Sequence, residues 1–391
     1  MSSNFNDGGF INKMRLFFKS RRNLRILGGL GICIGLILLF NVINDDVNPE
    51  DVVTGKNLRG KGIKVGIVLS GKGKGDKSFN DSAIEGLERA KRELGITYKD
   101  IELKENSENI DALAFLAQQD FDLVIGVGFS IVDVLKETAI KYPNVKFALV
   151  DASYPDGEVP NNVGLVFKDN EGSYLAGVLA AEMSKTKKVG FIGGMESPVI
   201  QGFEGGFTAG AKSVKGTEVY TGYVASNPSG FTDLDKGREL TLDFISRGVD
   251  VVYHAAGATG QGVFDAAASK GIKAIGVDSN QNYVKPGVIL ASMLKCVDVA
   301  VYEVCEDVVD KKFEGGITKT FGLADGGVGL TDLYNLTIEE TEGVSKEDEE
   351  KIKALKDSIP VEIKRKIEKV KEDIISGKIV VPNWKIEGKH E

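Results

Sequence analysis

Residues 63–93, IKVGIVLSGKGKGDKSFNDSAIEGLERAKRE, contain one complete strand–loop–helix unit. The run Ile63–Leu69 is apolar without polar alternation, which is typical of a parallel strand buried on both faces. A glycine-rich loop follows, and then Ser78–Glu93 has the apolar spacing of a helix that Asp76 or Ser78 caps. Similar units recur along the chain, and strand–helix alternation on this scale predicts an α/β fold with doubly wound sheets.

The pattern is interrupted once, at Asp156–Asn162, where proline, glycine and asparagine cluster, and it restarts at Val189. Two similar α/β lobes in tandem are the simplest interpretation. The predicted strands are Ile63–Leu69, Leu123–Val127, Lys146–Val150, Val163–Phe167, Val189–Ile192, Glu218–Val224, Val249–Tyr253, Lys273–Val277 and Val288–Met293. The predicted helices are Ser78–Glu93, Asn109–Gln119, Ile131–Lys141, Gly172–Ser184, Phe203–Val214, Leu234–Ser246, Gln261–Ala268 and Val297–Val309. The charged C-terminal segment, Thr337–Lys389, is predicted to add helices at Ser345–Asp357 and Val361–Ser376 and an edge strand at Lys378–Pro382.

Composition excludes several classes of function. The chain has 391 residues, and 49 basic against 57 acidic side chains give a net charge of −8. An acidic balance argues against nucleic acid as a partner, because phosphate binding needs a basic surface. Three cysteines and two histidines argue against a disulfide framework, a histidine-based metal site and a histidine-driven hydrolase.

The N-terminal region predicts a membrane anchor. Residues 26–43 are almost entirely apolar and, as a helix of about 27 Å, just cross a hydrocarbon core. Basic residues precede this run and acidic residues follow it, so residues 1–25 are expected in the cytoplasm and the rest outside, after a tether at 44–62. A cleaved signal peptide and a lipoprotein modified at Cys33 are the alternatives.

Polar and aromatic residues gather in loops that follow the predicted strands. Ligands of doubly wound sheets bind beyond the carboxyl ends of the strands, so these loops are candidate ligand contacts. In the first loop Gly75 is followed by Asp76, which breaks the phosphate-loop motif, and the dinucleotide fingerprint also fails. Each carboxylate alone also fits a helix cap or a turn, and His254 fits either a ligand hydrogen bond or simple packing. The loops are Ser70–Asn80, Gly126–Ser130, Asp151–Ser153, Ser229–Asp233, His254–Gly262 and Asp278–Asn280, with Lys295 after a later strand.

The chain carries the motifs Asp76-Lys-Ser-Phe-Asn80, Phe147-Ala-Leu-Val-Asp151, Gly172-Ser-Tyr-Leu-Ala-Gly177, Phe203-Glu-Gly-Gly-Phe-Thr-Ala-Gly210, Ala255-Ala-Gly-Ala-Thr-Gly260 and Gly276-Val-Asp-Ser-Asn-Gln281. Together these motifs resemble those of the basic membrane protein family, substrate-binding components of ABC importers that include purine nucleoside receptors. The resemblance implies a type I periplasmic-binding fold with lobe 1 at 63–165 plus 288–391 and lobe 2 at 166–287. It places three crossings between the lobes near Val163–Asp169, Asp278–Ala291 and Thr318–Ala324.

The resemblance also implies a ligand site, most simply for a purine nucleoside. Phe79 and Phe231 would sandwich the base and Asn80 would hydrogen-bond it. Asp278 and Lys295 would hold the ribose, with Gly257 allowing close backbone approach. Asp76 and Asp151 complete the predicted ligand-binding set. The protein would bind without catalysis or a cofactor and would deliver its ligand to an ABC permease in the cell membrane; a membrane-anchored sensor or regulator with the same fold is the alternative.

The first loop departs from the family. Many members carry an aspartate near the positions of Ser70 and Gly71, where this chain has none. Lys72 and Lys74 stand there instead, either as contacts to a negatively charged group or as solvated side chains. The expected contact to the sugar is therefore altered.

Overall fold

The computed structural model of the protein describes residues 58–103 and 109–387. The predicted cytoplasmic tail, the anchor at 26–43 and nearly all of the tether lie outside these residues. Within the described ranges, no helix is long and apolar enough to cross a membrane. Residues from Arg59 onward form one compact unit that contains two sheets.

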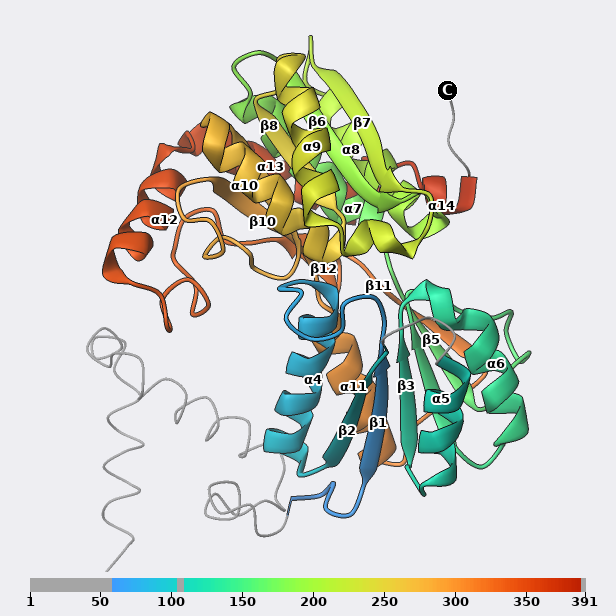
Figure 1. Ribbon diagram of the computed structural model, residues 1–391. Coiled ribbons are helices and arrows are strands. Elements are labelled where there is room, and N and C mark those ends of the chain that lie inside the picture. Colours follow the sequence, from blue (N-terminus) through green and yellow to red (C-terminus); the bar gives the residue numbers. More distant parts are fainter. Residues whose placement is uncertain (1–57, 104–108, 388–391) are drawn as a thin grey trace, which may run out of the picture. The chain divides into compact units, whose positions relative to one another are not determined.

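The first sheet has six parallel strands in the order β11-β5-β4-β3-β1-β2. Its strand β1 alternates between two apolar layers, because Ile67 and Leu69 pack toward α4 and α11 whereas Val68 packs toward α5 and α6. Figure 1 shows these two helix pairs on opposite faces of the sheet. The strands are β1 (Lys64–Leu69), β2 (Thr97–Glu102), β3 (Leu123–Val127), β4 (Lys146–Val150), β5 (Asn162–Phe167) and β11 (Ile317–Phe321), and the helices are α4 (Phe79–Leu94), α5 (Asn109–Gln118), α6 (Val132–Lys141) and α11 (Val297–Val309).

The second sheet repeats this plan in the order β12-β10-β9-β8-β6-β7, parallel except for β12. Helices α7 and α8 pack closely at glycines, since a Cβ on Gly177 would lie 2.1 Å from the carbonyl oxygen of Phe207. The strands are β6 (Lys188–Met195), β7 (Glu218–Ala225), β8 (Val251–Ala255), β9 (Lys273–Asp278), β10 (Ile289–Lys295) and β12 (Val328–Leu330), and the helices are α7 (Asp169–Met183), α8 (Pro198–Lys212), α9 (Leu234–Ser246) and α10 (Gly260–Lys270).

Within the described residues, the chain passes between the two lobes three times, and one crossing differs from the expectation. The first, at Lys168, lies in the predicted range, and the third runs over residues 322–327, overlapping the range predicted. The prediction that the second crossing lies at Asp278–Ala291 is wrong. Strand β10 pairs in parallel with β9, so the chain stays in the second sheet until Lys295 and crosses at Cys296.

The C-terminal helices also lie with the second sheet, although the predicted lobe 1 includes residues 288–391. Helix α12 (Lys346–Ser358) packs near β10, α13 (Val361–Ile375) packs on α7, and α14 (Trp384–Glu387) packs on α8. Both α12 and α13 were predicted. The predicted edge strand at Lys378–Pro382 is wrong, because these residues have no strand partner.

Candidate functional site

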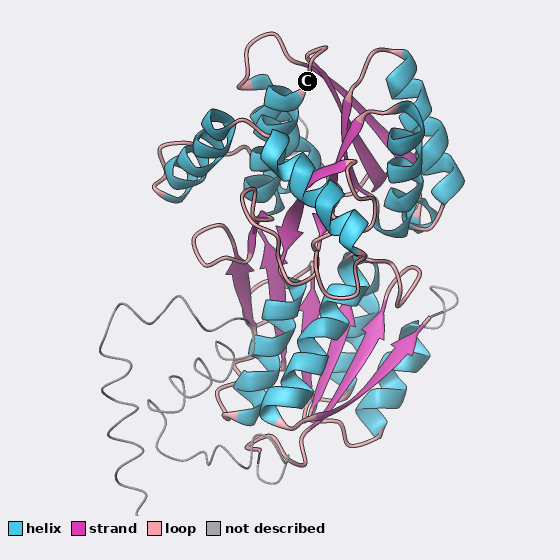
Figure 2. Ribbon diagram, turned by 90° about the vertical axis from the view of Figure 1, so that its left-hand side faces the viewer, coloured by secondary structure: helices cyan, strands magenta, loops and turns pink. Residues whose placement is uncertain are grey.

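A cleft, partly open to solvent, lies where the carboxyl ends of the two sheets face each other. Figure 2 shows the strands of the first sheet pointing toward the second. The structure brings all of the predicted ligand-binding residues to this cleft: Asp76, Phe79, Asn80, Asp151, Phe231, Gly257, Asp278 and Lys295.

Each lobe contributes aromatic rings to the cleft. Phe79 is the first residue of α4, and Phe231 ends the short turn Pro228–Phe231 against the backbone of Gly194. Phe129 was not singled out in the sequence, although its loop was. Its ring meets that of Phe231 edge-on at 6.4 Å, so it links the two lobes across the cleft. Aromatic faces of this kind stack on planar rings of a ligand.

Asp76 caps α4, so the cap interpretation holds for this residue. Its carboxylate accepts hydrogen bonds from the backbone N–H groups of Ser78 and Asn80, both at 2.9 Å. Burial raises the pKa of Asp76, and these hydrogen bonds oppose the shift. The Asn80 amide nitrogen donates to Asp76 and to the Ser70 carbonyl, both at 2.9 Å. The Asn80 Oδ1 is buried without a hydrogen-bond partner among the described residues, so it is an acceptor free for a ligand.

A buried lysine forms the polar floor of the cleft. The Lys295 Nζ lies 2.5 Å from an oxygen of Asp151 and 3.3 Å from an oxygen of Asp169, and the lysine side chain is only 1% exposed. Burial alone would lower the pKa of Lys295, but the surrounding carboxylates raise it above its ordinary value, so the lysine stays charged. The ring centroids of Phe79, Phe167 and Phe203 lie 5.1–5.2 Å from the same nitrogen.

Asp169 is part of this cluster and was missed in the sequence. It is the first residue of α7, at the first crossing, and it lies behind Lys295 rather than on the cleft wall. Burial raises its pKa, against the opposing charges of Lys295 and Lys385. Its position in the Asp-Asn-Glu-Gly sequence before a helix fits an ordinary helix start, and nothing local in the chain indicates a lysine partner far away in sequence.

Asp151 and Asp278 occupy equivalent places in the two lobes. Asp151 follows β4 and Asp278 ends β9, the corresponding strand of the second sheet. Both adopt left-handed backbone conformations, with φ of 71° and 66°. Such strained non-glycine residues cluster at functional sites. The Ser78 hydroxyl donates a short hydrogen bond to Asp278, and burial raises the pKa of Asp278 to about 7.

The loop after Asp278 also contacts the first lobe. The Lys77 carbonyl accepts hydrogen bonds from Ser279 Oγ at 3.1 Å and from Gln281 Nε2 at 2.7 Å. The backbone of Lys77 adopts a left-handed conformation, with φ of 56°. Its carbonyl oxygen faces the second lobe, where it accepts the hydrogen bond from Gln281. These bonds hold the two lobes together beside the cleft.

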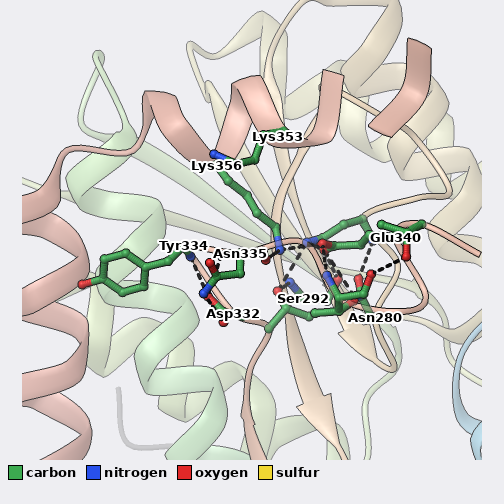
Figure 3. A network of polar contacts seen from close by, with 12 residues as sticks. Asn280, Ser292, Asp332, Tyr334, Asn335, Glu340, Lys353 and Lys356 are labelled. Atoms are coloured by element: carbon green, nitrogen blue, oxygen red, sulfur yellow. Dashed lines mark hydrogen bonds and ion pairs between the residues drawn. The ribbon is translucent and has the colours of Figure 1, made fainter. Parts of the chain in front are cut away.

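A buried polar network fixes this loop from behind, as Figure 3 shows. Asn282 donates to Glu340 at 2.7 Å and accepts from the Ser292 hydroxyl at 2.9 Å. Glu340 is paired with Lys356 of α12 at 2.6 Å, and both side chains are almost completely buried. Because unpaired buried charges are costly, this pairing ties the C-terminal helices to the loop that carries Asp278.

Of the three other loop residues considered in the sequence, Lys72, Lys74 and His254, only Lys72 lines the cleft. Lys72 lines the cleft, and its ammonium donates to the Gly75 carbonyl at 3.3 Å. Lys74 turns away to Asp100 on β2, 2.5 Å distant. His254 does not line the cleft but packs edge-on against Phe264 at 4.8 Å, which settles the choice between its two interpretations in favour of packing. Burial lowers its pKa to about 3. In the described ranges, no group of acidic, cysteine or histidine side chains could hold a metal ion.

Comparison with known proteins shows which family and fold the chain resembles. A model of the family described as PnrA-like ABC transporter substrate-binding proteins matches residues 63–379. The "ABC transporter nucleoside-binding protein BmpA" of Lactococcus lactis is 37% identical over 345 residues, which cover 82% of this chain and 89% of the relative. An uncharacterised lipoprotein of Pyrococcus horikoshii is 37% identical over 287 residues, 70% of each chain. A solved ABC transporter solute-binding protein of Aeropyrum pernix superimposes with a TM-score of 0.72 at 31% identity, over 82% of this chain and 94% of that one.

Proposed function

Because this chain belongs to the Bmp family of PnrA-like ABC transporter substrate-binding proteins, we propose that it binds a purine nucleoside and delivers it to an ABC importer. The fold is then of the type I periplasmic-binding kind, with the two lobes closing around the ligand. The observation that carries this proposal is the convergence of the predicted ligand residues, from loops far apart in sequence, on one cleft with an aromatic ring from each lobe.

The base is bound between the rings of Phe79 and Phe231. Stacking on an aromatic face contributes about 1–3 kcal/mol per base and tolerates different bases, so hydrogen bonds must set the specificity. The free Oδ1 of Asn80 accepts a hydrogen bond from an N–H group of the base. A Cβ at Gly257 would lie 3.3 Å from the Phe231 carbonyl oxygen. The absence of a side chain at Gly257 therefore allows the backbone to come close to the ring of the base.

The ribose hydroxyl groups are bound on the polar floor. Asp151 and Asp278 accept hydrogen bonds from hydroxyls, and Lys295 donates to a hydroxyl oxygen. Closure of the lobes removes water from these contacts and strengthens them. The cleft binds and releases its ligand without chemistry, because its carboxylates are committed to helix capping, to Lys295 and to Ser78 rather than to an activated nucleophile.

The protein acts outside the cytoplasm, where it meets the ligand before the permease does. We propose that the single-pass anchor predicted at residues 26–43, which lie outside the described residues, holds it at the membrane. Fractionation of cells into soluble and membrane material, combined with mass determination of the mature N-terminus, distinguishes this anchor from a lipidated Cys33 or a cleaved signal peptide. An intact N-terminus in the membrane fraction is the expected result.

Thermal unfolding of the full chain against a ligand panel tests the function. The panel contains adenosine, guanosine, inosine, cytidine, uridine, free bases and simple sugars. A ligand present at 100 times its dissociation constant stabilises the folded state by about 2.7 kcal/mol. A rise in the unfolding midpoint with purine nucleosides alone is the expected result, and no rise with any member of the panel would contradict the proposal.

A further inference from the structure

The last described segment of the chain docks on the side of the second lobe. The Asn170 amide donates to the backbone carbonyls of Val381 and Pro382, at 3.2 and 3.3 Å. Trp384 lies against α8 at Gly205, where a Cβ would come within 2.7 Å of the indole ring. A glycine in a buried helix costs about 1 kcal/mol relative to alanine, so its presence here is explained by the room that the indole needs. The family match ends at residue 379, before this contact.

The next residue, Lys385, reaches the charged floor of the cleft from behind. Its Nζ lies 4.0 Å from one carboxylate oxygen of Asp169, and the other oxygen of that carboxylate lies 3.3 Å from Lys295. Lys295 in turn lies 2.5 Å from Asp151. The side chain of Asp169 is completely buried, whereas that of Lys385 is 20% exposed. Two carboxylates and two ammonium groups therefore alternate in a row from the tail to the cleft.

Only the last two members of this row touch the cleft. Asp151 and Lys295 line it, and Asp169 and Lys385 do not. Without Lys385, the buried charge of Asp169 would be balanced by Lys295 alone. Lys295 would then be drawn toward Asp169, and Asp151 would lose its ion-pair partner at the point where a ligand hydroxyl binds.

We propose that Lys385 is a positioning residue for the ligand cleft. Lys385 and Lys295 both pair with the carboxylate of Asp169, and this shared pairing keeps Lys295 in its ion pair with Asp151. This proposal rests on the nucleoside-binding function proposed above. It assigns to the tail beyond residue 379 a role in the affinity of the site, although none of the tail residues that the structure describes lines the cleft. A tail that merely covers apolar surface would give the same docking but no dependence on the charge of Lys385.

Five variants of the full chain separate these roles: four single variants, and one double variant that combines Asp169→Asn with Lys385→Met. Lys385→Met removes the charge, Lys385→Arg retains it, and Asp169→Asn removes its partner. Lys378→Met makes the same change just before the tail, at an exposed lysine that pairs with Asp373 instead. The chain contains a single tryptophan, Trp384, so its fluorescence reports whether the tail remains docked in each variant.

Isothermal titration with adenosine, guanosine and inosine gives the affinities. We expect Lys385→Met to weaken binding about 10-fold, or about 1.4 kcal/mol, with unchanged tryptophan emission. Lys385→Arg should restore binding and Lys378→Met should leave it unchanged. In the Asp169→Asn background, Lys385→Met should have no further effect, because there is no carboxylate left to share.

Two results would overturn the proposal. One is equal binding by Lys385→Met and the unmodified protein; the other is the same loss from Lys385→Met with and without Asp169→Asn. If the unmodified protein binds none of the three nucleosides, the proposed function fails, and the positioning role is then judged without ligand. In that case the unfolding midpoints of the two single variants and the double variant are compared, and additive changes would rule out coupling between Lys385 and Asp169.

Discussion

The carboxyl group of Asp278 offers a direct measure of the electrostatics of the cleft. Burial raises its pKa from 3.8 to about 7, although Lys295 and the Ser78 hydroxyl oppose the shift. We expect Asp278→Asn to preserve the local structure. Asparagine accepts the hydrogen bond from Ser78 and tolerates the positive φ of 66° at this position.

The sign of the effect follows from the two pKa values. Between pH of about 4 and 7 the unfolded chain has released this proton and the folded protein still holds it, so the free energy of unfolding falls as the pH rises. Three pKa units at 1.36 kcal/mol each give a loss of about 4 kcal/mol, complete above about pH 7. Asp278→Asn lacks this loss, so its stability relative to the unmodified protein should rise by that amount across the window. His254, whose pKa burial lowers to about 3, gives a slope of opposite sign in both proteins and cancels in the difference.

Urea unfolding of the full chain, followed by far-ultraviolet circular dichroism from pH 4 to 8, measures this difference. Asp243→Asn on α9, where the side chain is 56% exposed, serves as the matched control for the amide substitution. A stability difference between Asp278→Asn and the unmodified protein that stays constant across the pH range would refute the reasoning. It would mean that Lys295 keeps Asp278 ionised despite its burial.

Three further predictions concern the rings, the contact between the lobes and the packing. Phe79→Ala and Phe231→Ala should each weaken purine nucleoside binding by about 1–3 kcal/mol in calorimetry, and unchanged affinity in both would remove the sandwich. Ser279→Ala removes one hydrogen bond between the lobes, worth about 0.5–1.5 kcal/mol, and should increase the radius of gyration of the ligand-free protein in small-angle scattering; an identical scattering curve would show that this bond does not hold the lobes together. Gly177→Ala should destabilise the protein by about 1–3 kcal/mol in urea, because its Cβ would meet a backbone carbonyl of α8, whereas Gly329→Ala has open space and should not; equal midpoints for the two would contradict the packing argument.

The regular elements could be predicted because buried parallel strands and amphipathic helices leave a periodic pattern in the sequence. Each predicted strand except Lys378–Pro382, and each predicted helix, overlaps one in the structure. Strand β2 was missed because it lies at a sheet edge, where its alternating exposed residues, TYKDIE, resemble a polar loop. Helix α8 begins earlier than predicted, at Pro198, after a Ser197 side chain that accepts from the Ile200 N–H; this Ser-Pro start is a signal that the sequence does carry.

What could not be predicted depends on long-range pairing. The sheet to which β10 belongs is set by its contact with β9, and an apolar run alone does not indicate a partner. For the same reason, the loops that carry the candidate site were predictable from their places after strands, whereas Phe129 and Asp169 acquire their roles only when Phe231 and Lys295 come close to them.

The order in which the strands occur along the chain has a consequence for biosynthesis. Strand β11 completes the outer edge of the first sheet beside β5, and β12 completes the outer edge of the second beside β10. Both belong to one short segment, residues 317–330, late in the sequence. A growing chain that has not yet reached Ile317 therefore leaves β5 and β10 with open edges, which are prone to pair with other chains. Emergence of that one segment supplies the last strand of both sheets at nearly the same moment, after which the second lobe still awaits helices α12, α13 and α14.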